Sequence, residues 1–75
     1  MPRPTLNATI WPNPVSDRLN VRTTDRMTLQ VIDPMGRSVR TVQVHGTTSI
    51  DVGDLPSGMY VLRNQDGASK RFIVR

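Results

Sequence analysis

The side chains able to carry out acid–base, nucleophilic or redox chemistry are few in this sequence. His45 is the single histidine, cysteine and glutamate are absent, and all six acidic residues are aspartates. A hydrolytic site needs a nucleophile, a base and an orienting acid close together, and no spacing around His45 provides them. Because His45 precedes Gly46, we expect an exposed histidine in a turn. The sequence therefore predicts that the protein is not an enzyme.

Metal and cofactor sites find equally little support. Asp51 and Asp54 are close enough in sequence to share a hard cation. Two carboxylates nevertheless fall well short of the roughly six to eight oxygens that calcium prefers, so capping of a turn is the favoured interpretation. The five glycines stand singly and form no phosphate-binding loop. We expect no metal-binding or cofactor-binding residue.

The chain is basic, with ten basic and six acidic residues and a formal net charge of +4. A surplus of this kind attracts phosphates, anionic sugars and anionic lipids. The arginines are spread singly among the aspartates, however, as on solvated strand faces. Binding of nucleic acid would need exposed rings beside basic groups, and only Trp11 near Arg18 fits that description. We therefore expect no nucleic-acid partner.

The segments that must position any functional side chain favour β-structure. Val, Ile and Thr supply 21 of the 75 residues, and their branched side chains pack well on a pleated sheet. Strong helix formers are scarce, since alanine occurs twice and lysine once. A chain of this length forms one domain. We predict a single all-β domain with little or no helix.

Alternation of apolar and polar residues predicts seven short strands. A change of phase after Val39 predicts a bulge near residues 40–41. Breaks are expected at 12–14, 23–26, 33–36, 45–46, 53–54 and 64–67, where proline, glycine and aspartate gather. The predicted strands are 6–11, 18–22, 27–32, 37–44, 48–52, 58–63 and 69–74.

Seven short strands in so short a chain favour an antiparallel, immunoglobulin-like β-sandwich over a closed barrel. The segment 58–63 is apolar on both faces, so we expect it to be a central strand. Tyr60 occupies the place of a tyrosine corner, in which its hydroxyl would donate to a carbonyl group a few residues upstream. The predicted core contains Leu19, Val21, Leu29, Val31, Ile50, Val52, Tyr60, Leu62 and Phe72.

Four short motifs follow one another along the chain: Pro12-Asn13-Pro14, Asp33-x-x-Gly36-Arg37, Leu55-x-x-Gly58-x-Tyr60, and the basic, apolar segment 70–75. In this order and spacing they resemble the C-terminal sorting domain of bacterial type IX secretion, also called the Por secretion system type A sorting domain. The resemblance covers residues 10–75. It implies recognition roles for Pro12, Asn13, Pro14, Asp33, Gly36, Arg37, Leu55, Gly58, Tyr60, Lys70, Arg71 and Arg75.

The resemblance implies a secretion signal rather than a catalyst. The domain would follow a larger cargo protein, would be recognised by the outer-membrane type IX translocon or its shuttle protein, and would be removed by a sortase-like peptidase. It would pass through the periplasm and then reach the outer membrane, the cell surface or the extracellular space. We expect four of its basic residues to be exposed and available for recognition, namely Arg37, Lys70, Arg71 and Arg75.

Two other interpretations remain open from the residues. A β-sandwich module that binds sugar or protein on a secreted enzyme is the alternative function, and an unpaired edge strand could join two copies as a homodimer. Residues 1–4 are not followed by the apolar core of a signal peptide. We therefore expect a piece of a longer secreted protein, with one domain over 1–75 in which residues 1–5 are a flexible linker or a remnant of expression.

Overall fold

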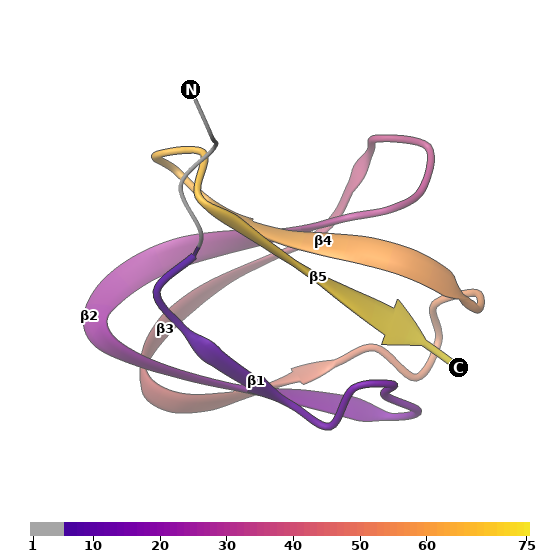
Figure 1. Cartoon of the computed structure of the whole chain (residues 1–75), viewed down its shortest axis with the longest axis horizontal. Helices are drawn as coiled ribbons and strands as arrows, with labels where there is room; N and C mark the ends of the chain where they lie inside the picture. The colour runs from indigo at the N-terminus through magenta and orange to yellow at the C-terminus, as the bar shows by residue number, and fades with distance from the viewer. Residues whose placement is uncertain (1–5) are drawn as a thin grey trace.

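Five antiparallel strands form one strongly bent sheet in the computed structural model, which describes residues 6–75 (Figure 1). The strands are β1 (Thr9–Trp11), β2 (Arg18–Ile32), β3 (Ser38–Asp51), β4 (Gly58–Asn64) and β5 (Ser69–Val74). The described residues contain no helix, and so none that could cross a membrane. The predicted antiparallel all-β class is confirmed.

The long strand β2 organises the sheet. On one side it pairs with β3 from Arg18 to Ile32. On its other side β1 pairs with the first half of β2, and β4 pairs with the second half. β5 then pairs with β4, so β4 lies between two strands, as its two apolar faces predicted. β1 and β4 therefore share one side of β2, and β5 lies beyond β4.

The prediction of seven strands was wrong, because two predicted breaks are bends within continuous strands. The expected turn at 23–26 lies inside β2, and His45-Gly46 lies inside β3. The two irregularities face each other in the sheet: Thr23 pairs with Gly46, and Met27 pairs with Val44, so β2 carries extra residues at the corner. The paired strands therefore bend together instead of ending.

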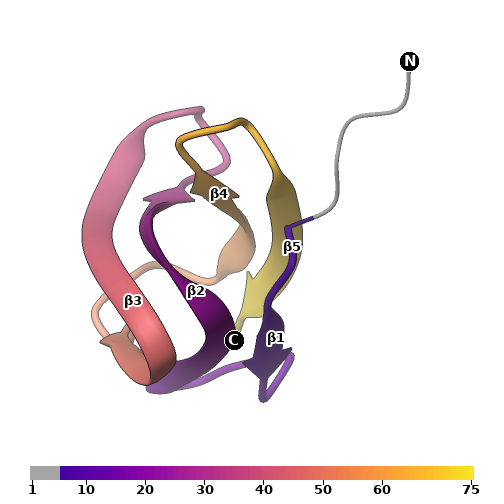
Figure 2. The same ribbon diagram turned by 90° about the vertical axis from the view of Figure 1, so that its left-hand side faces the viewer.

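The bend brings the two halves of the sheet over a shared core. The half that carries β1 faces the half that carries β4 and β5 (Figures 1 and 2). All five strands belong to one hydrogen-bonded sheet, so the expected immunoglobulin-like arrangement of two separate sheets is not confirmed.

The predicted bulge near residues 40–41 is present one position earlier, because Val31 pairs with Arg40 and Ile32 with Ser38, which leaves Val39 as the extra residue.

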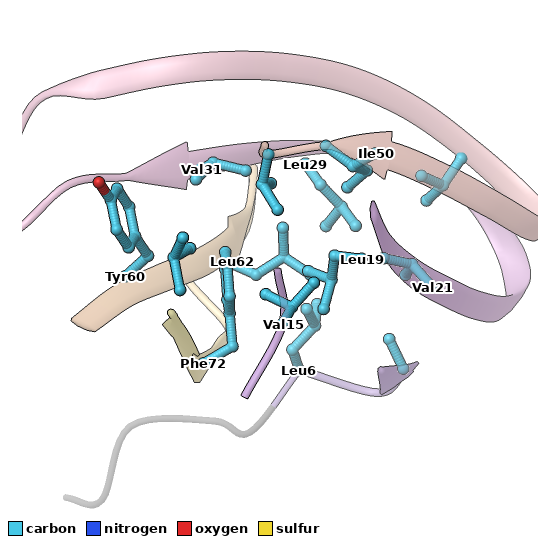
Figure 3. Packing of buried hydrophobic residues seen from close by; sticks show 14 of the residues in the cluster. Leu6, Val15, Leu19, Val21, Leu29, Val31, Ile50, Tyr60, Leu62 and Phe72 are labelled. Carbon is cyan, nitrogen blue, oxygen red and sulfur yellow. The ribbon is translucent and has the colours of Figure 1, made fainter. Parts of the chain in front are cut away.

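The core fills the space inside the bend (Figure 3). All nine predicted core residues are buried, and the rings of Tyr60 and Phe72 stack with their centroids 5.9 Å apart. Four further large apolar side chains complete it, namely Leu6, Val15, Val44 and Val74. Leu6 lies before β1 and Val15 lies after it, so the segments on both sides of this short strand contribute to the core.

Candidate recognition site

The Pro12-Asn13-Pro14 motif is hydrogen-bonded to the last strand. The side-chain oxygen Asn13 Oδ1 accepts a hydrogen bond from the Ile73 amide at 3.0 Å. Directly after the motif, the Val15 amide donates to the Ile73 carbonyl at 2.8 Å, and the Val15 carbonyl accepts from the Arg75 amide at 2.8 Å. Because proline has no amide hydrogen, this short parallel pairing depends on the Asn13 side chain and on Val15.

A second set of contacts joins the opposite end of β5 to the segment before β1. The Leu6 amide donates to the Ser69 carbonyl at 3.1 Å, and Lys70 Nζ donates to the Ala8 carbonyl at 2.8 Å. Lys70 lies on the same face of β5 as the buried Phe72 and is itself only partly exposed. The expectation that Lys70 is freely exposed was therefore wrong, since its amine serves to close the sheet.

The Asp33-x-x-Gly36-Arg37 motif forms the hairpin turn between β2 and β3, as predicted. Asp33 Oδ1 accepts from the amides of Met35 and Arg37 at 2.9 and 2.8 Å, and Asp33 Oδ2 accepts from Arg37 Nε at 3.2 Å. Hydrogen bonding from the Arg37 amide, with a further contribution from its positive charge, lowers the pKa of Asp33 below its usual 3.8. Gly36 has a φ of 87°, which only glycine adopts without strain.

The Leu55-x-x-Gly58-x-Tyr60 motif forms the predicted tyrosine corner. The Tyr60 hydroxyl donates to the Pro56 carbonyl at 2.6 Å while its ring stays in the core, and Leu55 packs against that core. A Cβ atom built on Gly58 would lie 3.4 Å from Cγ of Pro34. The corner therefore contacts the turn formed by the previous motif.

These contacts place the first three motifs and the C-terminal end of the fourth at one end of the molecule. Pro34 of the second motif lies against Gly58 of the third, Gly58 pairs with Val74 of the terminal segment, and Val74 bridges to Val15 beside the first motif. This end is on the right in Figure 1, where the β2–β3 turn, the β3–β4 connection and the C-terminus lie. Motifs up to 60 residues apart in the chain are thus neighbours in the fold.

The aspartates near the β3–β4 connection cap a turn or pair with arginine. Within residues 6–75, no group of three His, Cys, Asp or Glu side chains lies close enough to hold a metal ion. Asp51 Oδ1 accepts from the Gly53 amide at 3.0 Å, which confirms the predicted turn-capping role, and Asp54 instead pairs with Arg40. That hydrogen bond from the Arg40 side chain lowers the pKa of Asp54.

Trp11 is exposed, but the arginine beside its ring is not the expected one. The guanidinium carbon of Arg22, not that of Arg18, lies 5.9 Å from the centre of the Trp11 ring. The reason is the register of β1 against β2, which pairs Thr9 with Arg22. Tyr60 and Phe72, the other two aromatic residues, are buried. The described surface therefore carries one exposed ring, already covered by a cation.

Sequence reasoning missed an exposed apolar pair on the two last strands. Met59 on β4 and Ile73 on β5 are register partners, and they are 52% and 44% exposed. The signal that could have revealed them is the run 58–63, whose second apolar face was interpreted only as evidence for a central strand. On the outer side of this run, Met59 and its partner Ile73 are exposed, whereas Val61 is half-buried.

Comparison with known proteins gives a family for this chain. A family model described as a secretion system C-terminal sorting domain matches residues 9–75, which include all five strands and all four motifs. Searches of curated proteins and of solved structures found no match. The resemblance seen in the motifs is thereby confirmed. The chain belongs to the family of secretion system C-terminal sorting domains, which implies a type IX secretion signal that follows a cargo protein and an export route to the outer membrane, cell surface or extracellular space.

Proposed function

We propose that this domain, a single unit over residues 1–75, carries a cargo protein attached N-terminal to it through the outer-membrane type IX translocon. It is in transit in the periplasm, is recognised there by the translocon or its shuttle protein, and is then removed by a sortase-like peptidase. The observation that carries the proposal is the meeting of three family motifs and the C-terminal end of the fourth at one end of the folded domain. These contacts exist only in the folded chain, so the sorting signal is complete only after the domain has folded.

The position of Leu6 is compatible with this role. The chain enters the described fold at Leu6, beside Ser69 at the start of β5, whereas the motifs gather around Val74 at the end of β5. Five residue steps of a strand span about 17 Å. A cargo joined before Leu6 therefore leaves the motif end uncovered, and a cut at or upstream of residues 1–5 would release the cargo and leave the five strands between residues 6 and 75 intact.

Export of a fusion protein tests the proposal. The 75-residue chain is placed behind a signal peptide and a soluble reporter in a type IX-competent cell. We expect the reporter at the cell surface or in the medium, with a mass that shows loss of the domain. In a matched strain without the translocon the reporter should stay in the periplasm, and without the sortase-like peptidase it should retain the domain. A wild-type fusion that remains periplasmic in the competent cell contradicts the proposal.

The alternative, a module that binds sugar or protein on a secreted enzyme, has weaker support. Sugar-binding faces stack rings of the ligand on exposed aromatic side chains. The described surface offers Trp11 alone, with Arg22 lying over it. The same fusion separates the two functions, because a binding module does not require the translocon to reach its ligand and gives no translocon-dependent export.

A further inference from the structure

Most motif side chains are already engaged inside the domain. Asn13 forms a hydrogen bond with β5, Asp33 forms one with the Arg37 amide in its turn, and Tyr60 forms one with the Pro56 carbonyl. Lys70 is bonded to the Ala8 carbonyl. A group that must give up an internal hydrogen bond to make an external one gains little from the exchange. The motif side chains thus stabilise the fold, and a partner protein gains more binding energy from side chains that form no hydrogen bond within the domain.

Such side chains lie on the outer side of β4 and β5. Tyr60 and Leu62 point into the core, so their strand neighbours point outward, and the same alternation holds on β5 around Phe72. We call the outward set, together with its neighbour on β2, the outer face. It consists of Ile32, Met59, Val61, Arg63, Ser69, Arg71 and Ile73.

The centre of the outer face is apolar. Met59 and Ile73 face each other across the two strands and are about half exposed. Next to them, Val61 pairs with Ile32 of β2. Ile32 is buried, yet it does not belong to the main core cluster. The domain thus has a second, smaller apolar cluster that is open to solvent on one side.

The outer face is also hollowed. A depression of about 430 Å³ is lined by Ile32, Val61, Arg63, Gly67 and Ser69. A polar depression of about 350 Å³ adjoins it, shares Arg63 and Gly67, and adds side chains of β2 and of the β4–β5 hairpin, among them Gln30 and Gln65. A shape of this kind accepts side chains of another molecule better than a flat sheet does.

The charge of the outer face is positive and uncompensated. The outward side chains of β4 and β5 include Arg63 and Arg71 but no carboxylate. Both ion pairs among residues 6–75, Asp33–Arg37 and Arg40–Asp54, lie elsewhere. Arg63 makes only a long 3.5 Å contact with Gln30. Free guanidinium groups beside an apolar centre complement a protein surface in which apolar side chains are flanked by carboxylates.

The opposite outer surface, over β1 and the first half of β2, lacks this character. Arg22 there covers the Trp11 ring and contacts Thr47 Oγ1 at 3.5 Å. Asn20 Oδ1 accepts from the Ser49 hydroxyl at 2.9 Å. These side chains satisfy one another within the domain, so that surface is the weaker candidate.

We propose that the outer face of β4 and β5 is the docking surface for a protein of the export machinery, and that the docking segment carries apolar side chains flanked by Asp or Glu. This inference rests on the proposed sorting function and names the chemistry of its partner. The apolar centre supplies the burial, and the guanidinium group of Arg71 supplies the charge complementarity.

The test uses the reporter fusion with substitutions confined to the outer face. Export should fall about tenfold or more in the double variant Met59→Thr with Ile73→Thr, and also in Arg71→Glu, as expected for loss of central interface contacts. Arg71→Lys should keep part of the export. The matched control is the exposed Arg26→Glu, which lies away from the outer face and outside the four motifs and should export normally.

The outcomes separate this inference from the sorting function. A wild-type fusion that is not exported refutes the sorting function itself. Normal export of the wild type and of all outer-face variants refutes the docking surface and leaves the sorting function standing. The unfolding midpoint of each variant chain shows whether the fold is kept. If the apolar double variant is destabilised, Arg71→Glu decides the question, because an exposed charge contributes little to stability.

Two other occupants are tested with the purified 75-residue chain. We expect a monomer in sedimentation velocity, and a dimer that Met59→Thr with Ile73→Thr dissociates would identify a second copy as the occupant. We also expect no flotation with vesicles of phosphatidylcholine and phosphatidylglycerol. Flotation that Arg71→Glu abolishes would identify an anionic lipid surface instead. Either result overturns the proposed protein partner.

Discussion

Asn13, Asp33 and Tyr60 each satisfy backbone groups that the local chain leaves unpaired. Asn13 bonds an amide of β5, Asp33 bonds two amides of its own turn, and Tyr60 bonds a carbonyl group four residues upstream. Unpaired backbone groups are costly when they are taken from water. The bonds of Asn13 and Asp33 are exposed and that of Tyr60 is partly buried, so this cost applies most directly to Tyr60.

Replacement of the Tyr60 hydroxyl should cost stability without removing the ring from the core. Tyr60→Phe deletes the donor at 2.6 Å from the Pro56 carbonyl and leaves the contact with Phe72. We expect a loss of about 1 kcal/mol in the free energy of unfolding, measured by urea denaturation. An unchanged midpoint would show that the corner does not stabilise the domain.

Asn13→Ala should loosen the end of β5. The substitution removes the acceptor of the Ile73 amide, and we expect a loss of about 1 kcal/mol in the free energy of unfolding together with faster hydrogen exchange of that amide. The matched control is the exposed Asn7→Ala, which should leave the exchange rate of Ile73 unchanged. Equal protection of the Ile73 amide in Asn13→Ala and the wild type would contradict this role.

At the scale of the elements, the paired bend in β2 and β3 is the feature that shapes the sheet. Thr23 lies at the corner, is buried, and donates its hydroxyl to the Asp25 carbonyl at 2.9 Å. Opposite it, Gly46 has a φ of 75°. The corner thus combines a bulge on one strand with a left-handed residue on the other, which is how sheets turn sharply without losing their pairing.

Gly46→Ala tests the bend directly. A Cβ atom at this position would meet nothing within 4 Å, so any loss of stability comes from the backbone conformation alone. We expect a cost of about 1 to 2 kcal/mol in the free energy of unfolding, and a smaller cost for Gly46→Asn, because asparagine tolerates this conformation better. Thermal or urea denaturation of both variants gives the comparison. Equal stability of Gly46→Ala and the wild type would mean that the bend tolerates a different φ.

At the scale of the whole molecule, β5 closes the fold and carries the outer face. Its ends are tied to Leu6 and Val15, its inner side chains fill the core, and its outer side presents Arg71 and Ile73. If the proposed docking surface is correct, folding and recognition share this strand. A sorting signal built in this way presents its docking surface only after the domain has folded.

The domain should lose stability in acid. The pKa values of Asp33 and Asp54 are lowered in the folded state by hydrogen bonds from Arg37 and Arg40. Their contribution is therefore complete above roughly pH 4 and is lost as the pH falls through the lowered values. Protonation of all six aspartates also leaves a chain with positive charges only, which adds repulsion.

Urea denaturation between pH 7 and pH 2 measures this dependence. The midpoint should be level above roughly pH 4 and should fall below it, and Asp33→Asn should reduce the fall. The matched control is Asp66→Asn, since the Asp66 carboxylate makes no hydrogen bond or ion pair with residues 6–75. A midpoint that does not change between pH 4 and pH 2 would contradict the assigned role of these carboxylates.

The sequence by itself determined the features that depend on neighbouring residues. Alternation identified the all-β class and the nine core residues, because a side chain and the one two positions away lie on the same side of a strand. Turn chemistry identified the hairpin at Asp33 and the corner at Tyr60. The order of the four motifs identified the family, which the match over residues 9–75 confirms. Expectations for residues 1–5 lie outside the described residues.

Only the tertiary structure decided what depends on partners far along the chain. Gly46 signals a break in the sequence, but a glycine with positive φ serves a turn and a bend equally well, and only the pairing of Thr23 with Gly46 shows which one occurs. The same holds for Lys70, whose partner Ala8 is 62 residues away, and for Asn13, whose partner Ile73 is 60 residues away. Alternation predicts that Met59 and Ile73 have an outer side. Whether another strand covers it depends on the path of the whole sheet.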